Sequence, residues 1–171
     1  FRRAREVGED GLVEHLEAFL RDVVPVAESL GVRLALHPDD PPWSIFGLPR
    51  IVSNAVGLER AVRAIDSPAN ALTLCTGALG ASAGNDLVAI AASFADRIAF
   101  VHARNVRRTG VRDFHEVAHH PSAGDVDLLR VLEPLVAAGV DVPIRPDHGR
   151  MLWGEHAIPG YGSCDGAIGH A

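Results

Sequence analysis

The sequence lacks lysine altogether, has only two cysteines and contains no long apolar run, and each absence excludes a class of protein. Without lysine, the chain cannot form a lysine Schiff base with a carbonyl substrate. Cys75 and Cys164 are too few for a disulfide-stabilised scaffold and suit the reducing cytoplasm. No stretch is long and apolar enough to cross a bilayer, and no signal-peptide pattern follows the basic first residues. We therefore expect a cytoplasmic protein without a membrane partner.

The charge balance is acidic, with 22 aspartates and glutamates against 16 arginines and a formal net charge of −6. A nucleic-acid-binding domain needs a basic face, so we expect no nucleic-acid partner. One local cluster of arginines runs against this balance: Arg104, Arg107, Arg108 and Arg112. We interpret Arg107 and Arg108 as solvated loop residues. A hydrophobic share of 47% over 171 residues predicts a single globular domain with its own core.

Segments with helical spacing of apolar residues alternate along the chain with short apolar runs. The helical spacing occurs at 10–30, 58–65, 86–95 and 126–138, and the short runs are 32–36, 71–74, 98–101 and 142–144. Pro25 is expected to kink or restart the first helix near its end. Short apolar strands that alternate with helices predict an α/β fold with a buried parallel sheet.

A histidine, cysteine or aspartate stands just past the end of each predicted strand. These residues are His37, Cys75, His102 and Asp147. The carboxyl ends of parallel strands share one edge of a sheet, so these four side chains should converge, as in the active sites of (β/α)₈ barrels. Four strands make only half of such a barrel, and the pattern alone does not separate a half barrel from a small doubly wound sheet.

Each of the four residues is a competent metal ligand, although each alone also has an ordinary structural explanation. The argument for a metal site rests on their recurrence at the equivalent place in four successive units. Imidazoles and a thiolate suit Zn²⁺ or Fe²⁺, and a carboxylate also accepts Mn²⁺. The residue types do not decide among these ions.

A series of longer blocks makes the chain recognisable. Among them are HPDDPPW at 37–43, IFGLPR at 45–50, DSPAN at 66–70, LCTG at 74–77, FVH at 100–102, GDVD at 124–127, RPDHGR at 145–150, WGE at 153–155 and PGYG at 159–162. In order and spacing these blocks resemble the D-mannonate dehydratase family, from about residue 10 to residue 162.

The resemblance implies a lyase with a TIM (β/α)₈ barrel, of which this chain would supply about four C-terminal βα units. The family dehydrates the sugar acid D-mannonate to 2-keto-3-deoxy-D-gluconate in hexuronate (glucuronate) catabolism, with Mn²⁺ or Fe²⁺. Its metal ligands match His37, Cys75, His102 and Asp147. Its acid/base residues match His148 and Tyr161. Arg104 and Arg145 are candidates for binding the substrate, or else for structural ion pairs.

Two features depart from the family. The chain is shorter than the roughly 250 residues of a typical barrel, so we expect a partial TIM barrel, 1–171, from which the N-terminal strands are missing. Open sheet edges would then favour association into a homo-oligomer. After PGYG the sequence also leaves the family pattern, and Cys164 is not expected to be a ligand.

Two other functions remain open at this point. A metal-dependent sugar isomerase of the barrel type would use similar ligands, although the RPDHGR block counts against it. A truncated remnant would bind metal, or only associate with itself, without turnover.

Overall fold

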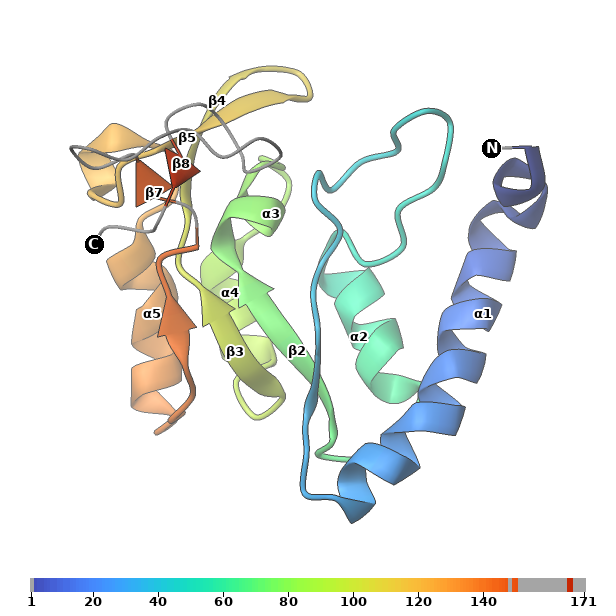
Figure 1. Ribbon diagram of the computed structural model, residues 1–171. Coiled ribbons are helices and arrows are strands. Elements are labelled where there is room, and N and C mark those ends of the chain that lie inside the picture. Colours follow the sequence, from blue (N-terminus) through green and yellow to red (C-terminus); the bar gives the residue numbers. More distant parts are fainter. Residues whose placement is uncertain (1, 148, 151–165, 168–171) are drawn as a thin grey trace.

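The computed structural model describes residues 2–147, 149–150 and 166–167 (Figure 1). The helices are α1 (Arg2–Ser29), α2 (Ala55–Arg63), α3 (Thr76–Gly80), α4 (Leu87–Ser93) and α5 (Leu128–Ala137), with a 3₁₀ turn η1 at Pro121–Ala123. The strands are β1 (Leu34–Leu36), β2 (Asn70–Cys75), β3 (Ile98–His102), β4 (Asn105–Gly110), β5 (Asp113–Val117), β6 (Ile144–Arg145), β7 (Gly149–Arg150) and β8 (Gly166–Ala167). Within these described residues, no helix has the length and apolar character of a membrane span.

The central sheet has four parallel strands in the order β1-β2-β3-β6. Neighbouring strands of this sheet therefore follow one another along the chain, apart from the β4–β5 excursion. Because parallel crossovers are right-handed, a sheet built in sequence order carries its connecting helices on one face. Figure 1 shows α2, α4 and α5 behind the sheet and α1 beside α2. The predicted α/β fold with a parallel sheet is confirmed.

Three helices begin at side chains that cap them. The side chains of Asn54, Asp86 and Asp127 accept hydrogen bonds from the backbone N–H of Gly57, Ala89 and Arg130. Each bond satisfies an N–H group that has no partner inside its own helix. The helices α2, α4 and α5 thus start at polar residues directly before their apolar positions.

The main core lies between the sheet and these three helices. On β2, Leu72 and Leu74 belong to this core together with Leu58 of α2, Ile90 of α4 and Leu135 of α5. Side chains alternate between the two faces of a strand. Ala71, Thr73 and Cys75 therefore belong to the opposite face, whereas the side chain of Asn70 faces α2 and donates to the Ala61 carbonyl.

The first helix differs in detail from the expectation. It runs through Pro25 without leaving helical backbone angles, and its break falls instead at Gly8, where φ is 68°. Pro25 has no N–H to donate to the Arg21 carbonyl, but both residues are exposed, so water can satisfy that carbonyl. The helix therefore does not restart at Pro25, and α1 packs through Leu20 and Val24 against Ala69.

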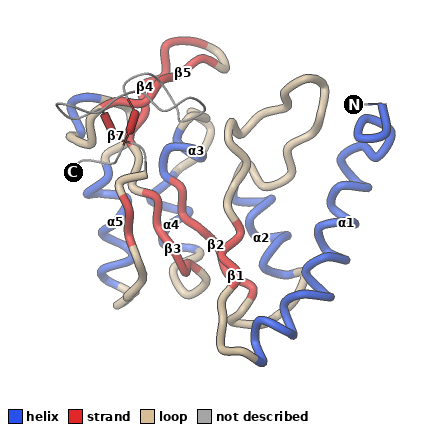
Figure 2. Tube along the Cα trace, in the orientation of Figure 1, coloured by secondary structure: helices blue, strands red, loops and turns tan. Residues whose placement is uncertain are grey.

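The long segment after β3, expected to be a loop, contains an antiparallel hairpin, β4–β5. It stands over the carboxyl ends of the sheet strands (Figure 2). The buried Asn105 anchors its base, donating to the carbonyls of Ala118 and His120 and accepting from the N–H of Val126. Arg107, interpreted as solvated, is exposed and also donates to the Ala123 carbonyl. Arg108 is half-buried and donates to the Gly80 carbonyl. These hydrogen bonds join the hairpin to the η1 turn and to α3.

Two leucines of α5 test the position of the core. Leu135 is 4% exposed, whereas Leu129 on the same helix is 69% exposed. Leu135→Ala should lower the free energy of unfolding by about 2–5 kcal/mol, because it removes buried methyl groups and leaves a cavity. Leu129→Ala should change it by less than about 0.5 kcal/mol. Urea unfolding followed by circular dichroism measures both, and equal losses would contradict this packing.

Candidate metal centre

Parallel pairing brings four potential ligands to one edge of the sheet. In the strand register, Cys75 lies opposite His102, and His102 lies opposite Arg145, two residues before Asp147. His37 follows β1 directly. One ligand atom each from His37, Cys75 and His102 lies within 4.8 Å of the others. The strand ends therefore converge, as the pattern of ligand types predicts.

Asp147 completes this group from the other side. Its carboxylate Oδ2 lies 3.9 Å from Cys75 Sγ, and its Oδ1 lies 3.6 Å from His102 Nδ1. The side chain is only 5% exposed. Its backbone is in the left-handed region, with φ of 71°, which aspartate adopts more readily than most residues. The turn after β6 thus directs the carboxylate inward.

The two imidazoles face each other in forms suited to bind a cation. His37 Nδ1 lies 2.6 Å from the Pro38 carbonyl, which can only accept a hydrogen bond. Nδ1 therefore donates, and the ring presents Nε2 to His102 Nδ1, 3.2 Å away. The pKa of His102 lies below its usual value, mainly because burial disfavours the charged ring, while Asp147 opposes this shift. A neutral His102 is competent to bind a metal.

Cys75 is fully buried at the start of α3, where its sulfur accepts a hydrogen bond from the Ala78 N–H. Burial raises the pKa of its thiol to about 12, and the positive charge of Arg104 only partly offsets this effect. The residue is a free cysteine. Without a metal ion beside it, the sulfur stays protonated at neutral pH.

Arginines and acids surround the ligands. Arg104 follows β3 and forms ion pairs with Asp40 at 2.7 Å, Glu116 at 3.2 Å and Asp147 at 3.6 Å. Arg145 pairs with Asp147 at 3.2 Å and is 47% exposed. Burial by itself lowers the pKa of Arg104, but Cys75, Asp40 and Glu116 together raise it. Arg104 therefore remains charged despite its burial.

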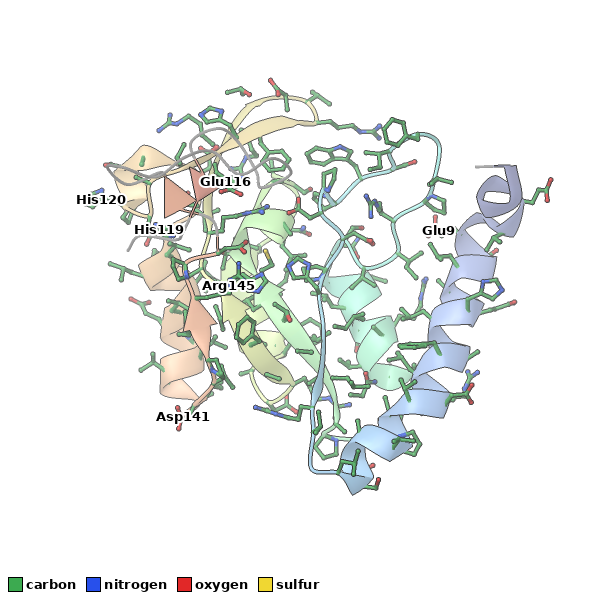
Figure 3. All side chains as sticks on the ribbon, in the orientation of Figure 1. Glu9, Glu116, His119, His120, Asp141 and Arg145 are labelled. Atoms are coloured by element: carbon green, nitrogen blue, oxygen red, sulfur yellow. The ribbon has the colours of Figure 1, made fainter. Side chains whose placement is uncertain are left out.

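Two loops and the hairpin close over this edge of the sheet. Figure 3 shows Glu116, His119 and Arg145 grouped around the carboxyl ends of the strands. His119 Nε2 lies 2.9 Å from the Pro146 carbonyl, directly before Asp147. Trp43 from the loop after β1 meets the ring of Phe114 edge-on, with centroids 5.6 Å apart. The hairpin region therefore contacts the loop after β1 and the turn after β6, which border the ligands.

The residues fit a divalent cation in donor type and in charge. Two imidazole nitrogens, one sulfur and one carboxylate match the preferences of Zn²⁺, Fe²⁺ and Mn²⁺. Formally, the carboxylates of Asp40, Glu116 and Asp147 face two arginines, which leaves one net negative charge. Ionisation of Cys75 makes it two, which a divalent ion neutralises.

The site holds residues that sequence reasoning did not single out. Asp40 and Glu116 are not among the predicted site residues, and both contact Arg104. The signal for Glu116 was its place in a strand whose alternation points it toward the sheet edge, which needs the hairpin to be recognised first. The predicted acid/base residues His148 and Tyr161 lie outside the described residues.

Comparison with known proteins finds one family along the whole chain. The family model described as D-mannonate dehydratase (UxuA) matches residues 1–171. Mannonate dehydratase 2 of Halalkalibacterium halodurans is 48% identical over 167 residues, covering 96% of this chain and 48% of the relative. Mannonate dehydratase of Enterococcus faecalis is 49% identical over 163 residues, covering 95% of this chain and 46% of the relative.

Structure comparison gives the same result. The crystal structure of mannonate dehydratase from Streptococcus suis serotype 2 matches with a TM-score of 0.86 and 40% sequence identity, over 91% of this chain and 45% of that one. The chain spans about half the length of the curated relatives that it matches. The fold, the motif blocks and the matches to relatives together establish that this chain belongs to the D-mannonate dehydratase family.

Proposed function

We propose that the chain acts in the metal-dependent dehydration of D-mannonate to 2-keto-3-deoxy-D-gluconate, within hexuronate catabolism. The observation that carries this proposal is the convergence of His37, Cys75, His102 and Asp147 at one sheet edge. Membership of the family supports the substrate, because the relatives are named for mannonate. The reaction removes one water molecule, so the enzyme is a hydro-lyase.

The sheet supports a place for this chain in a larger barrel. Four parallel strands in sequence order are what four successive βα units of a (β/α)₈ barrel would contribute. We therefore take residues 1–171 as a single domain that forms part of a TIM barrel. The ligands stand at the carboxyl end of the strands, which is the face where such barrels carry their active sites.

The ion proposed for the site is Mn²⁺ or Fe²⁺, held by His37, Cys75, His102 and Asp147. Bound there, it would supply a Lewis acid that stabilises negative charge developing on the substrate's oxygens. Both ions accept nitrogen, sulfur and oxygen ligands together. His37 is prepared for this task by the Pro38 carbonyl, which fixes its tautomer.

Proton transfer requires residues beyond the ligands. The reaction takes a proton from C2 of mannonate and releases the C3 hydroxyl as water, and the resulting enol becomes the 2-keto acid. His148 and Tyr161 are proposed as the acid and base for these steps. His148 is adjacent in sequence to Asp147, which supports its placement beside the ion.

The substrate carboxylate needs a cationic partner, and the two arginines differ in this respect. Arg145 is 47% exposed, so its guanidinium can reach a ligand from solvent while it still pairs with Asp147. Arg104 is 6% exposed and surrounded by acids. We therefore assign the substrate carboxylate to Arg145, and the exposure of the two side chains supports this choice.

Association and location complete the proposal. Ile144 on the edge strand β6 is 56% exposed. Unpaired sheet edges of this kind favour pairing with another chain. Homo-oligomer formation is proposed on this ground.

The free thiol of Cys75 supports a reducing, cytoplasmic location. The sugar isomerase alternative is not favoured, since the relatives are dehydratases.

Metal binding is the first test. Under anaerobic conditions the chain should bind about one Mn²⁺ or Fe²⁺, and Cys75→Ser should bind it at least about tenfold more weakly, because a soft thiolate ligand is lost. Equilibrium dialysis with elemental analysis measures both values. Ser93→Ala, at an exposed position of α4, is the control and should bind like the wild type. Equal binding by wild type and Cys75→Ser would exclude the thiolate from the site.

Product analysis is the second test. The metal-loaded protein supplied with D-mannonate should form a 3-deoxy-2-keto acid, detected by mass spectrometry as a loss of 18 mass units, one water. An isomerase would give a product of unchanged mass. A protein that binds its ion and forms neither product would be the truncated, inactive remnant, and the proposed activity of this chain would be wrong.

A further inference from the structure

Arg104 forms ion pairs with several segments of the chain at once. Its guanidinium reaches acids from three separate segments: Asp40 after β1, Glu116 on β5 and Asp147 after β6. These segments are far apart in sequence and have no strand pairing with one another. Arg104 is therefore a common partner for the two loops and the hairpin that border the proposed metal centre.

The chain also prepares a place for the arginine stem. The backbone N–H of Arg104 donates to Thr76 Oγ1 at 2.8 Å, and the same hydroxyl donates to the Arg104 carbonyl at 2.7 Å. The side chain then lies directly over Gly77. A Cβ at Gly77 would come within 2.7 Å of Arg104 Cδ and closer still to Nε. Only glycine at this position of α3 leaves room for Arg104.

Burial decides what this guanidinium can bind. The side chain is 6% exposed, and its Nε has no hydrogen-bond partner among the described residues. Burying a charge is costly unless partners compensate it, and here the compensation comes from three carboxylates. A substrate carboxylate would have to displace one of them. The geometry thus favours interaction with the protein's own acids over direct substrate binding.

We propose that Arg104 is a positioning residue, which holds Asp147 in place for the metal ion by tying it to Asp40 and Glu116. Its planar guanidinium can serve several carboxylates at fixed angles, which a lysine ammonium cannot do. The effect on the ion passes through Asp147, because the ion pair between the two side chains is buried on both sides. This inference rests on the metal centre proposed above.

The test compares Mn²⁺ affinity, followed by electron paramagnetic resonance of the free ion, among matched variants of the full chain. Arg104→Lys keeps the charge and loses the fork, and it should bind Mn²⁺ roughly 10–100-fold more weakly, as for other residues that orient ligands. In an Asp147→Asn background, Arg104→Lys should cause no further loss, because the residue through which it acts has already changed.

Two glycine substitutions keep the test decisive where Arg104→Lys fails to fold. Gly77→Ala displaces Arg104 without changing any charge, so it should weaken Mn²⁺ binding as Arg104→Lys does. Gly80→Ala lies on the same helix, but its Cβ would meet Val126 Cγ2 at 2.7 Å and not Arg104. It also overpacks its surroundings and should leave the Mn²⁺ affinity unchanged. Thermal unfolding of both variants reports their stability separately.

The outcomes separate the two proposals. Wild-type affinity in Arg104→Lys, or equal loss in Gly77→Ala and Gly80→Ala, would overturn the positioning role while the metal centre stands. Further loss from Arg104→Lys in the Asp147→Asn background would overturn action through Asp147. Absence of Mn²⁺ binding by the wild type would overturn the metal centre and the positioning role together.

Discussion

The parallel pairing of β1, β2, β3 and β6 is the constraint on which the rest of the site depends. It sets Cys75 beside His102 and His102 beside Arg145, and it brings the turn that carries Asp147 over the same edge. A register shift of one residue would turn these side chains to the other face of the sheet. The core leucines of β2 hold the register, because they fit between α2, α4 and α5 only from the helix-facing side.

Electrostatics then sets what this edge can bind. Burial keeps the thiol of Cys75 protonated and the ring of His102 neutral, while the acids around them keep Arg104 charged. Arg104 pairs with acids on three other segments, so the loops and the hairpin depend on one another. This mutual dependence gives a scaffold of short, irregular segments the fixed geometry that a ligand set requires.

Much of this arrangement follows from the sequence. Helical and strand periodicity predicted the four parallel strands within a few residues, and ligand types at the strand ends predicted the convergence of His37, Cys75 and His102. The β4–β5 hairpin was not predicted, because beyond the buried start of β4 its strands are mostly polar and exposed and lack the apolar alternation of a buried strand. For that reason Glu116 is not among the predicted site residues. The role of Arg104 depends on burial and on contacts between distant segments, which a local pattern does not contain.

The central claim is that thiolate, imidazole and carboxylate ligands from four strand ends surround one ion. X-ray absorption at the iron edge tests it most directly, on the full chain loaded anaerobically with Fe²⁺. The account predicts one sulfur neighbour together with nitrogen and oxygen neighbours in the first coordination sphere. A sphere of nitrogen and oxygen alone would contradict it, because Cys75 would then stand aside from the ion.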